Sequence, residues 1–400
     1  MKRKLISSFI ILAVGMAAIL WGAPALAKMM STSRPATQVG YDSTTARALV
    51  INIKEQGQIT LGTQAQTYQI FDIRVLEGQY EGKILEMNYG LNQIRSSSTL
   101  VQRGEEILVS VGEKQDGTLA AYFTDFIRTP QLIQLLMLFF LISILVGGWK
   151  GVRGLLGIIL SMAIIIFFII PMILKGYSPV WISILGSFVF LALSMYLVYG
   201  WNLKTHSAVL GMLLALCLTG GLSALFINIA RLTGYGDENA IYLVQMAQAN
   251  IDLRGLLLGG MIIGSLGVLD DLVISQASAV FELHGANSEL SISFLFNRAM
   301  NIGHDHVAAT VNTLVLAYAG ASLPMLLLFS LNNQNLGLLI NLDMMAEEIV
   351  RTLVGSIGLF LAVPITTGLA TLAAKRADRL GKLRPWLGPE NSIEGHSHTH

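Results

Sequence analysis

Residues 254–282 read RGLLLGGMIIGSLGVLDDLVISQASAVFE, an apolar run with two adjacent carboxylates, Asp270 and Asp271, near its middle. A helix of this length is long enough to cross a bilayer. A charged side chain near the bilayer centre raises the free energy of insertion by about 2.5–3.5 kcal/mol. The run therefore predicts a membrane-spanning helix whose two carboxylates face a bundle interior, a partner or water.

Helical periodicity separates the two carboxylates. With about 100° between successive residues, Asp271 lies on one line with small and polar residues, whereas Asp270 lies among apolar ones. The residues on the line of Asp271 are Gly264, Gly267, Ser275, Ser278 and Glu282. Small residues let helices approach closely, so we expect Asp271 to line a packed polar seam and Asp270 to face a different neighbour. The alternative is that the pair marks a helix end in contact with headgroups or water.

The rest of the chain is also apolar. Of its 400 residues, 53% are hydrophobic and 13% are charged, against about 25% charged residues in soluble domains. The net charge of +1 excludes a strongly basic nucleic-acid binder. The lone Cys217 excludes an internal disulfide. This composition is typical of a polytopic helical membrane protein.

Eight apolar stretches are long enough to span. Seven cover residues 131–149, 154–174, 179–199, 206–230, 254–282, 306–330 and 349–373. The eighth, within residues 1–28, follows Lys2, Arg3 and Lys4 and is either an anchor or a signal peptide. We predict an all-α polytopic membrane bundle of about eight transmembrane helices. Its seven-helix domain covers residues 131–384, and a tail over residues 385–400 contains His396, His398 and His400.

Residues 35–128 are more polar than the rest of the chain. Five short runs rich in β-formers cover residues 46–54, 66–76, 83–89, 106–111 and 118–126, with glycines between them. This spacing predicts a small β-barrel-like, OB-like domain. It lacks a cluster of aromatic and basic residues, so we expect no nucleic-acid partner.

Basic residues gather on one side of the predicted membrane. Lys150, Arg153 and Lys204 lie between helices, and Lys375 and Arg376 begin a basic segment after the last one. Because basic loops stay in the cytoplasm, we expect the β-rich domain to be extracytoplasmic. Both termini are then cytoplasmic if the first helix is uncleaved.

The segment after the helix of Asp270 contains further polar residues that could take part in a functional site. We expect a short amphipathic helix over residues 288–303, and then a spanning helix with His306, Thr310, Thr313 and Gly320 on one face. His304, Asp305 and His306 could relay protons, bind a metal or anchor the helix. The hydroxyls of Thr310 and Thr313 could instead bond to their own helix backbone.

Motifs for other chemistry are absent from the sequence. There is no GxxxxGK[ST] loop, GxSxG elbow, HExxH pair or CxxCH site. We therefore expect no enzymatic activity, no cofactor and no resident metal, and an ion gradient remains as the energy source.

Two stretches resemble a known family: GVLDDLVISQASAVFEL at 267–283 and GHDHVAATVNTLVLAYAGA at 303–321. Both are similar to the YibE/F-like family of bacterial membrane proteins, as are residues 348–358 and 364–368. The resemblance implies a multi-pass protein of the bacterial cytoplasmic membrane and implies no activity.

A more distant resemblance is to one half of RND transporters and of SecD/SecF. It consists of the Asp270–Asp271 pair, the run Asn297-Arg298-Ala299-Met300, and Thr310. In RND pumps paired aspartates carry protons, so the resemblance implies proton coupling. This sequence departs from it in having no evident partner lysine in the last two helices.

We therefore expect a proton- or cation-coupled transporter. Its coupling residues are Asp270, Asp271, Ser275, Thr310 and Thr313, and Gly264, Gly267 and Gly320 pack the helices. Expected partners are the lipid bilayer, an unknown transported ion or small molecule, and a second copy or a related membrane subunit. One alternative is a membrane-anchored scaffold whose β-domain binds an extracytoplasmic partner, and another is a metal-ion exporter.

Overall fold

The computed structural model describes residues 43–61, 64–91, 99–114, 117–246, 251–331, 336–376, 387 and 389–390. The predicted anchor or signal peptide (residues 1–28) lies outside this part of the chain, as does most of the histidine-containing tail (385–400). The chain divides into two units, residues 1–148 and 149–400. Each is described by itself.

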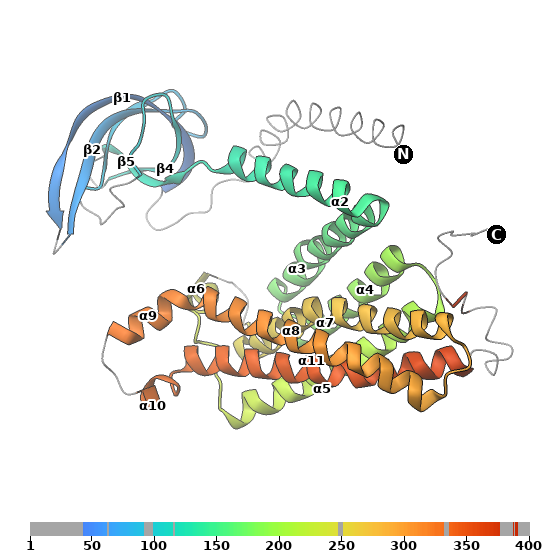
Figure 1. Cartoon of the computed structure of the whole chain (residues 1–400). Helices are drawn as coiled ribbons and strands as arrows, with labels where there is room; N and C mark the ends of the chain where they lie inside the picture. The colour runs from blue at the N-terminus through green and yellow to red at the C-terminus, as the bar shows by residue number, and fades with distance from the viewer. Residues whose placement is uncertain are drawn as a thin grey trace, which may run out of the picture. The chain divides into compact units, whose positions relative to one another are not determined.

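Five antiparallel strands form the sheet of the first unit (Figure 1). They are β1 (Ser43–Leu61), β2 (Gln64–Val75), β3 (Ile84–Tyr89), β4 (Glu106–Glu113) and β5 (Leu119–Phe126). The strand order is β3-β2-β1-β4-β5, and the two outer strands contact each other, so the sheet curls into a half-barrel. Each strand overlaps one of the five predicted β-rich runs, and β1 extends beyond its run (46–54) at both ends.

The long strand β1 makes this curvature possible. Its residues 43–49 pair with β4, and its residues 48–61 pair with β2. Register shifts between Val50 and Asn52, and between Ile53 and Glu55, are β-bulges, which bend a strand and increase its twist. One strand can therefore pair with β2 along one part of its length and with β4 along the other.

Alternating apolar residues fill the half-barrel. Ile107, Val109 and Val111 of β4 are buried while their neighbours are more exposed, as expected when successive side chains point to opposite faces. Where β3 meets β5, the ring of Phe123 lies 4.8 Å from that of Tyr89 and 5.0 Å from that of Phe126, measured between centroids. Edge-to-face contacts of this kind seal the seam between the outer strands.

Helix α2 (Thr129–Ile164) follows the sheet and is interrupted at Gly148, whose φ of 54° and ψ of −135° are not helical. A π-helical turn (Ile165–Ile169) and α3 (Ile170–Leu174) continue it. The predicted helices 131–149 and 154–174 therefore meet without a loop, and Lys150 and Arg153 lie within the helix. Glycine accommodates the positive φ at the break without the steric cost of a side chain.

The second unit begins within α2, at Trp149, and contains all the remaining helices (Figure 1). They are α4 (Pro179–Tyr199), α5 (Leu203–Ile229), α6 (Glu238–Met246), α7 (Leu253–Ala286), α8 (Ile292–Ala321), α9 (Leu323–Leu331), α10 (Leu336–Leu339) and α11 (Asp343–Arg376). In the described part of the chain, five helical segments are long and apolar enough to cross a membrane: 129–174, 179–199, 203–229, 253–286 and 343–376. These segments support a polytopic membrane bundle but not the predicted count of eight.

Helix α8 differs most from the prediction. The expected amphipathic helix (288–303) and spanning helix (306–330) are joined, because α8 runs without a break to Ala321. Gly303 is a packing residue here rather than a helix breaker: a Cβ on it would lie 2.5 Å from Val363 and 2.9 Å from Gln276. Polar residues in its second half, including His304 and Asn312, keep α8 outside the apolar spans.

The core of this unit lies between α5, α7, α8 and α11, and α4 packs on α7. The crossing of α5 and α11 depends on two glycines. A Cβ on Gly211 would collide with Thr366, and a Cβ on Gly358 would collide with Thr219. Small residues of this kind let membrane helices approach closely enough for strong van der Waals contact.

Replacing Gly211 with valine should lower the free energy of unfolding by about 1–3 kcal/mol, because the added methyl groups push α11 away. Thermal unfolding of the purified protein in detergent, followed by circular dichroism, measures the loss. Gly221→Val on the same helix is the matched control, since a Cβ there meets open space. Equal losses in the two variants would contradict the close α5–α11 crossing.

Candidate functional site

Helix α7 is at the centre of the bundle and packs against α4, α5, α8 and α11. Its buried side carries Leu266, Leu269, Val273, Ala277 and Val280, which recur at the three- and four-residue spacing of a helix face. Asp270 lies at the border of this packed side, and Asp271 lies on the opposite side. The two adjacent carboxylates therefore have different surroundings.

Asp270 is the enclosed member of the pair. Its side chain is partly buried, and its Oδ1 atom is fully enclosed with no hydrogen-bond partner in the described chain. Tyr199, the last residue of α4, packs against the apolar core that contains Leu269 of α7. No Lys or Arg of the described residues forms an ion pair with Asp270. An ionised carboxylate in such a place is costly, because it has lost water without gaining a partner.

Asp271 is exposed, and so is most of the predicted polar seam. Gly264, Gly267 and Glu282 are exposed, and Ser275 and Ser278 are partly exposed. Within one chain, the described helices therefore leave the seam that contains Asp271 uncovered. Helix α7 buries its larger apolar side instead, because burying Leu, Val and Ile side chains removes far more apolar surface than burying Gly and Ser.

In the described chain, no hydrogen bond joins the polar residues predicted on α8 to either aspartate. His304, Asp305, Thr313 and Gly320 are exposed, and His306 is partly buried. The hydroxyls donate to carbonyls of their own helix, Thr310 to His306 at 2.8 Å and Thr313 to Ala309 at 3.0 Å. This is the backbone-bonded alternative. No group of three His, Cys, Asp or Glu side chains in the described ranges is placed to hold a metal ion.

A buried glutamine forms the polar centre of the packed side. Gln276 is 1% exposed, and its Nε2 atom donates to the carbonyl of Ala299 on α8 at 2.9 Å and to Thr367 Oγ1 on α11 at 2.7 Å. Gly303 leaves room for this amide. One side chain thus joins three helices. Its sequence signal is a polar residue on the otherwise apolar face of the run, beside Val273 and Val280.

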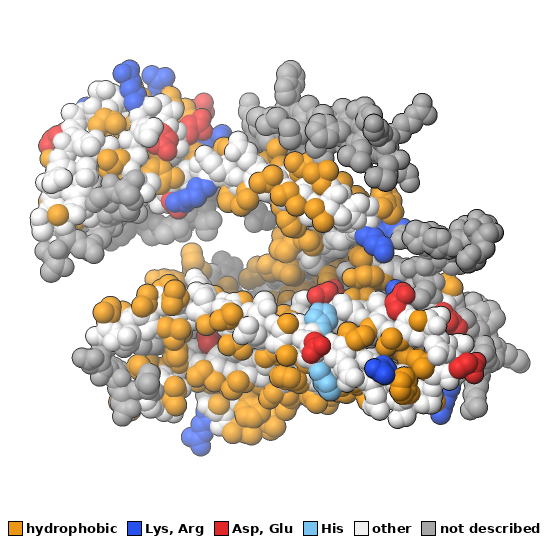
Figure 2. All heavy atoms as spheres, viewed as in Figure 1, with side chains coloured by type: hydrophobic (Ala, Val, Ile, Leu, Met, Phe, Trp, Pro, Cys, Tyr) orange, Lys and Arg blue, Asp and Glu red, His pale blue; other side chains and the backbone are white. Residues whose placement is uncertain are grey.

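Charged and polar side chains also remain on the outside of the bundle. Asp271 and Ser275 share one side of α7, and His304, Asp305 and Asn312 share one side of α8. We call these two groups together the polar face; all are exposed except Ser275, which is partly exposed. Figure 2 shows histidine and acidic side chains among largely hydrophobic ones over α8. Charges on a membrane-spanning surface are unfavourable in contact with lipid, so this face needs water or a protein to cover it.

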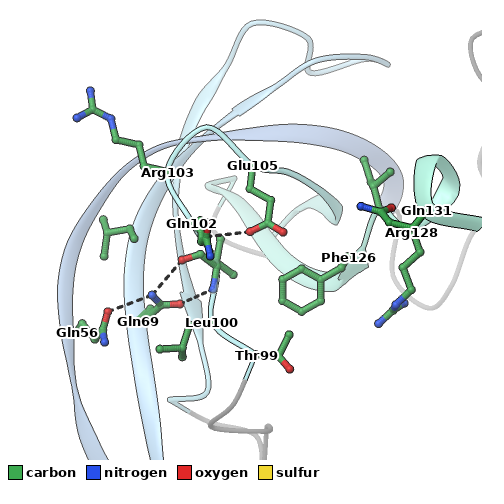
Figure 3. A pocket seen from close by; sticks show the side chains of 13 residues that line it. Gln56, Gln69, Thr99, Leu100, Gln102, Arg103, Glu105, Phe126, Arg128 and Gln131 are labelled. Carbon is green, nitrogen blue, oxygen red and sulfur yellow. Dashed lines mark hydrogen bonds between the residues drawn. The ribbon is translucent and has the colours of Figure 1, made fainter. Parts of the chain in front are cut away.

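The β-domain contains a separate pocket of about 750 Å³ (Figure 3). Its floor is fixed by the buried side chain of Gln69, which accepts from the backbone N–H of Val101 at 2.8 Å and donates to its carbonyl at 3.1 Å. Gln102 and Gln131 add amide groups to the wall, and Arg128 adds a guanidinium that is paired with Asp125 at 2.9 Å, whereas Arg103 points away in Figure 3. Amide and guanidinium donors in one pocket can hydrogen-bond a polar ligand.

A double-mutant cycle tests the three-helix link. Gln276→Met combined with Thr367→Val should give a coupling energy of about 1 kcal/mol, the usual size for interhelical hydrogen bonds in membranes. Reversible unfolding in bicelles measures it. Ser265→Ala combined with Thr367→Val is the control, since Ser265 donates only to Met261 of its own helix, at 2.7 Å. The control coupling should be close to zero, and an equal value in both cycles would refute the link.

A family model described as YibE/F-like protein matches residues 135–376. The match begins in α2 and ends at the last residue of α11, so it contains both aspartates and the Gln276 link. No curated protein and no solved structure matches the chain. The match covers more than half of the chain, and with its apolar helices this integral membrane protein belongs to the YibE/F-like family.

Proposed function

We propose that this protein is a proton-coupled membrane transporter in which Asp270 takes up the coupling proton. One observation carries the proposal: the Oδ1 atom of Asp270 is enclosed within an apolar, membrane-length helix and has no hydrogen-bond partner in the described chain. An unpartnered carboxyl group is unfavourable when charged. Binding a proton removes that cost, so proton uptake can favour one packing of the helices over another.

The neighbours of Asp270 suggest how the two states differ. Asp271, the next residue, places a second carboxylate beside it, and α4 packs on α7. Losing the proton leaves two like charges next to the α4–α7 contact, which favours separation of these helices or entry of water. A ligand or proton shifts such an equilibrium by its difference in affinity for the two states. The resemblance to RND halves supports the same role for the aspartate pair.

We also propose an orientation of the protein in the membrane. The basic helix ends face the cytoplasm of a bacterial cell, and the β-domain is extracytoplasmic. The strand order and the contact of β3 with β5 support an OB-like arrangement for that domain.

A second copy of the chain is proposed to cover the polar face. Asp271, His304 and Asp305 are exposed on the unit that contains four of the five apolar spans. Acidic and histidine side chains on one face can pair with the same face of another copy, as in a two-fold interface. The small residues Gly264 and Gly267 on the same side of α7 allow close approach.

A scaffold function is the second candidate, and the β-domain pocket favours it. A polar pocket with a rigid floor suits an extracytoplasmic peptide or glycan partner. A scaffold needs no proton movement, so a measurement of charge displacement separates the two candidates. The metal-exporter alternative has no comparable observation in its favour.

Asp270→Asn should abolish proton-driven charge displacement, because the amide keeps the size of the carboxyl but cannot bind the proton. The measurement is a pH jump applied to proteoliposomes on a solid-supported membrane. Glu282→Gln, an exposed carboxylate of the same helix, is the matched control and should retain the wild-type signal. Full charge displacement in Asp270→Asn, or no charge displacement in the wild type, would contradict the proposal.

Ser275→Cys in a Cys217→Ser background should form a cross-linked dimer in membranes, because Ser275 lies on the polar face. Leu225→Cys in the same background is the control; Leu225 is an exposed apolar side chain of α5. Gel electrophoresis after mild oxidation measures the dimer. A failure of Ser275→Cys to cross-link, or equal cross-linking at Leu225, would argue against the second copy.

A further inference from the structure

A second pocket, of about 520 Å³, lies where α5 ends and α7 begins. Two arginines line it, Arg231 and Arg254, together with Asn228, Thr233, Tyr235 and Asp252. Two guanidinium groups against one carboxylate leave the lining positive. None of these residues belongs to the proposed proton site.

Arg231 occupies a position that normally belongs to glycine. Its φ is 55°, the sole positive φ of a non-glycine residue in the described chain. It follows the last turn of α5, where Leu232 N–H donates to Ile227 O at 3.0 Å and Arg231 N–H donates to Asn228 O at 3.2 Å. These two bonds form a Schellman motif, whose left-handed residue is usually glycine because a Cβ is disfavoured there. Folding alone therefore favours glycine over Arg231, and backbone strain of this kind points to a use for the side chain.

Arg254 approaches from the first turn of α7. Its Nη2 atom donates to Asn228 Oδ1 at 2.9 Å and lies 3.5 Å from the carbonyl of Ile227. Both partners are neutral, so they orient the guanidinium without cancelling its charge. The acidic residue of the lining, Asp252, lies against its own helix, because a Cβ on Gly255 would be 2.5 Å from Asp252 Oδ2.

Helix α11 holds the rim of the pocket in place. Glu347 is 4% exposed, and its Oε1 atom accepts from the backbone N–H groups of Gly234 at 3.1 Å and Gly236 at 3.3 Å. The Thr233 hydroxyl donates to Asp343. The segment that carries Thr233 and Tyr235 is therefore fixed before a ligand arrives, which lowers the entropy lost on binding.

We infer that this pocket binds a phosphate-bearing anion through Arg231 and Arg254. The planar guanidinium groups offer paired N–H donors that match the oxygens of a phosphate. The pocket lies at the ends of two membrane-length helices, where the phosphate of a lipid headgroup and free phosphate can both reach it. The inference does not depend on the proposed proton coupling.

Calorimetric titration of the full-length protein in a neutral detergent tests the site with two probes, inorganic phosphate and short-chain phosphatidylglycerol. Arg231→Gly should weaken binding at least tenfold, yet keep or raise the unfolding temperature without ligand, because glycine suits the left-handed backbone. Arg254→Gln should weaken binding to a similar extent. Arg298→Gln, on α8 outside the pocket, is the matched control and should bind as the wild type does.

The outcomes separate the two sources of phosphate. Binding of inorganic phosphate that Arg231→Gly removes assigns the site to a free anion. Binding of phosphatidylglycerol alone, removed by the same change, assigns it to a lipid headgroup. The inference is overturned if neither probe binds, if Arg231→Gly and Arg254→Gln bind normally, or if Arg298→Gln loses as much affinity as they do.

Discussion

Polar groups inside a membrane bundle have no bulk water to bond to, so each must find its partner within the protein. Many hydroxyl side chains of this bundle find their partner within their own helix. Hydroxyls such as those of Ser207, Thr219 and Ser223 donate to a carbonyl four residues earlier in their own helix. Gln276 satisfies the same requirement across three helices and thereby fixes how they pack. Six enclosed side-chain atoms of the described chain have no such partner, and Asp270 is the one carboxyl group among them.

The same requirement explains the placement of small residues. A glycine at a crossing lets two helices approach until a side chain of one helix reaches the backbone of the other. Gly303 makes room for the Gln276 amide, and Gly211 and Gly358 admit Thr366 and Thr219. The positions of the glycines therefore decide both how closely the helices pack and which polar side chains can reach a partner on another helix.

Periodicity in the sequence predicts the individual strands and helices, but it does not predict which helix surfaces contact one another. The five strands and most helices follow from alternation, apolar run length and glycine spacing. A helical projection showed that Asp270 and Asp271 lie on different sides, but it could not show which side packs, because that depends on α5 and α11. Gly303 reads as a helix boundary in sequence, and only contact with Val363 and Gln276 makes it part of a continuous α8. The left-handed backbone of Arg231 has no sequence signal, since arginine is not a residue expected there.

The contacts of α11 also carry a consequence for the order of assembly during synthesis. Glu347 binds backbone groups of residues 234 and 236, more than a hundred positions earlier in the chain. The same helix supplies Thr367 to Gln276 and Thr366 to the α5 crossing. Helices made earlier can enter the membrane one by one, but their mutual packing must wait for the last one. Until α11 emerges from the ribosome, the surfaces of α5 and α7 that it covers in the folded protein stay uncovered.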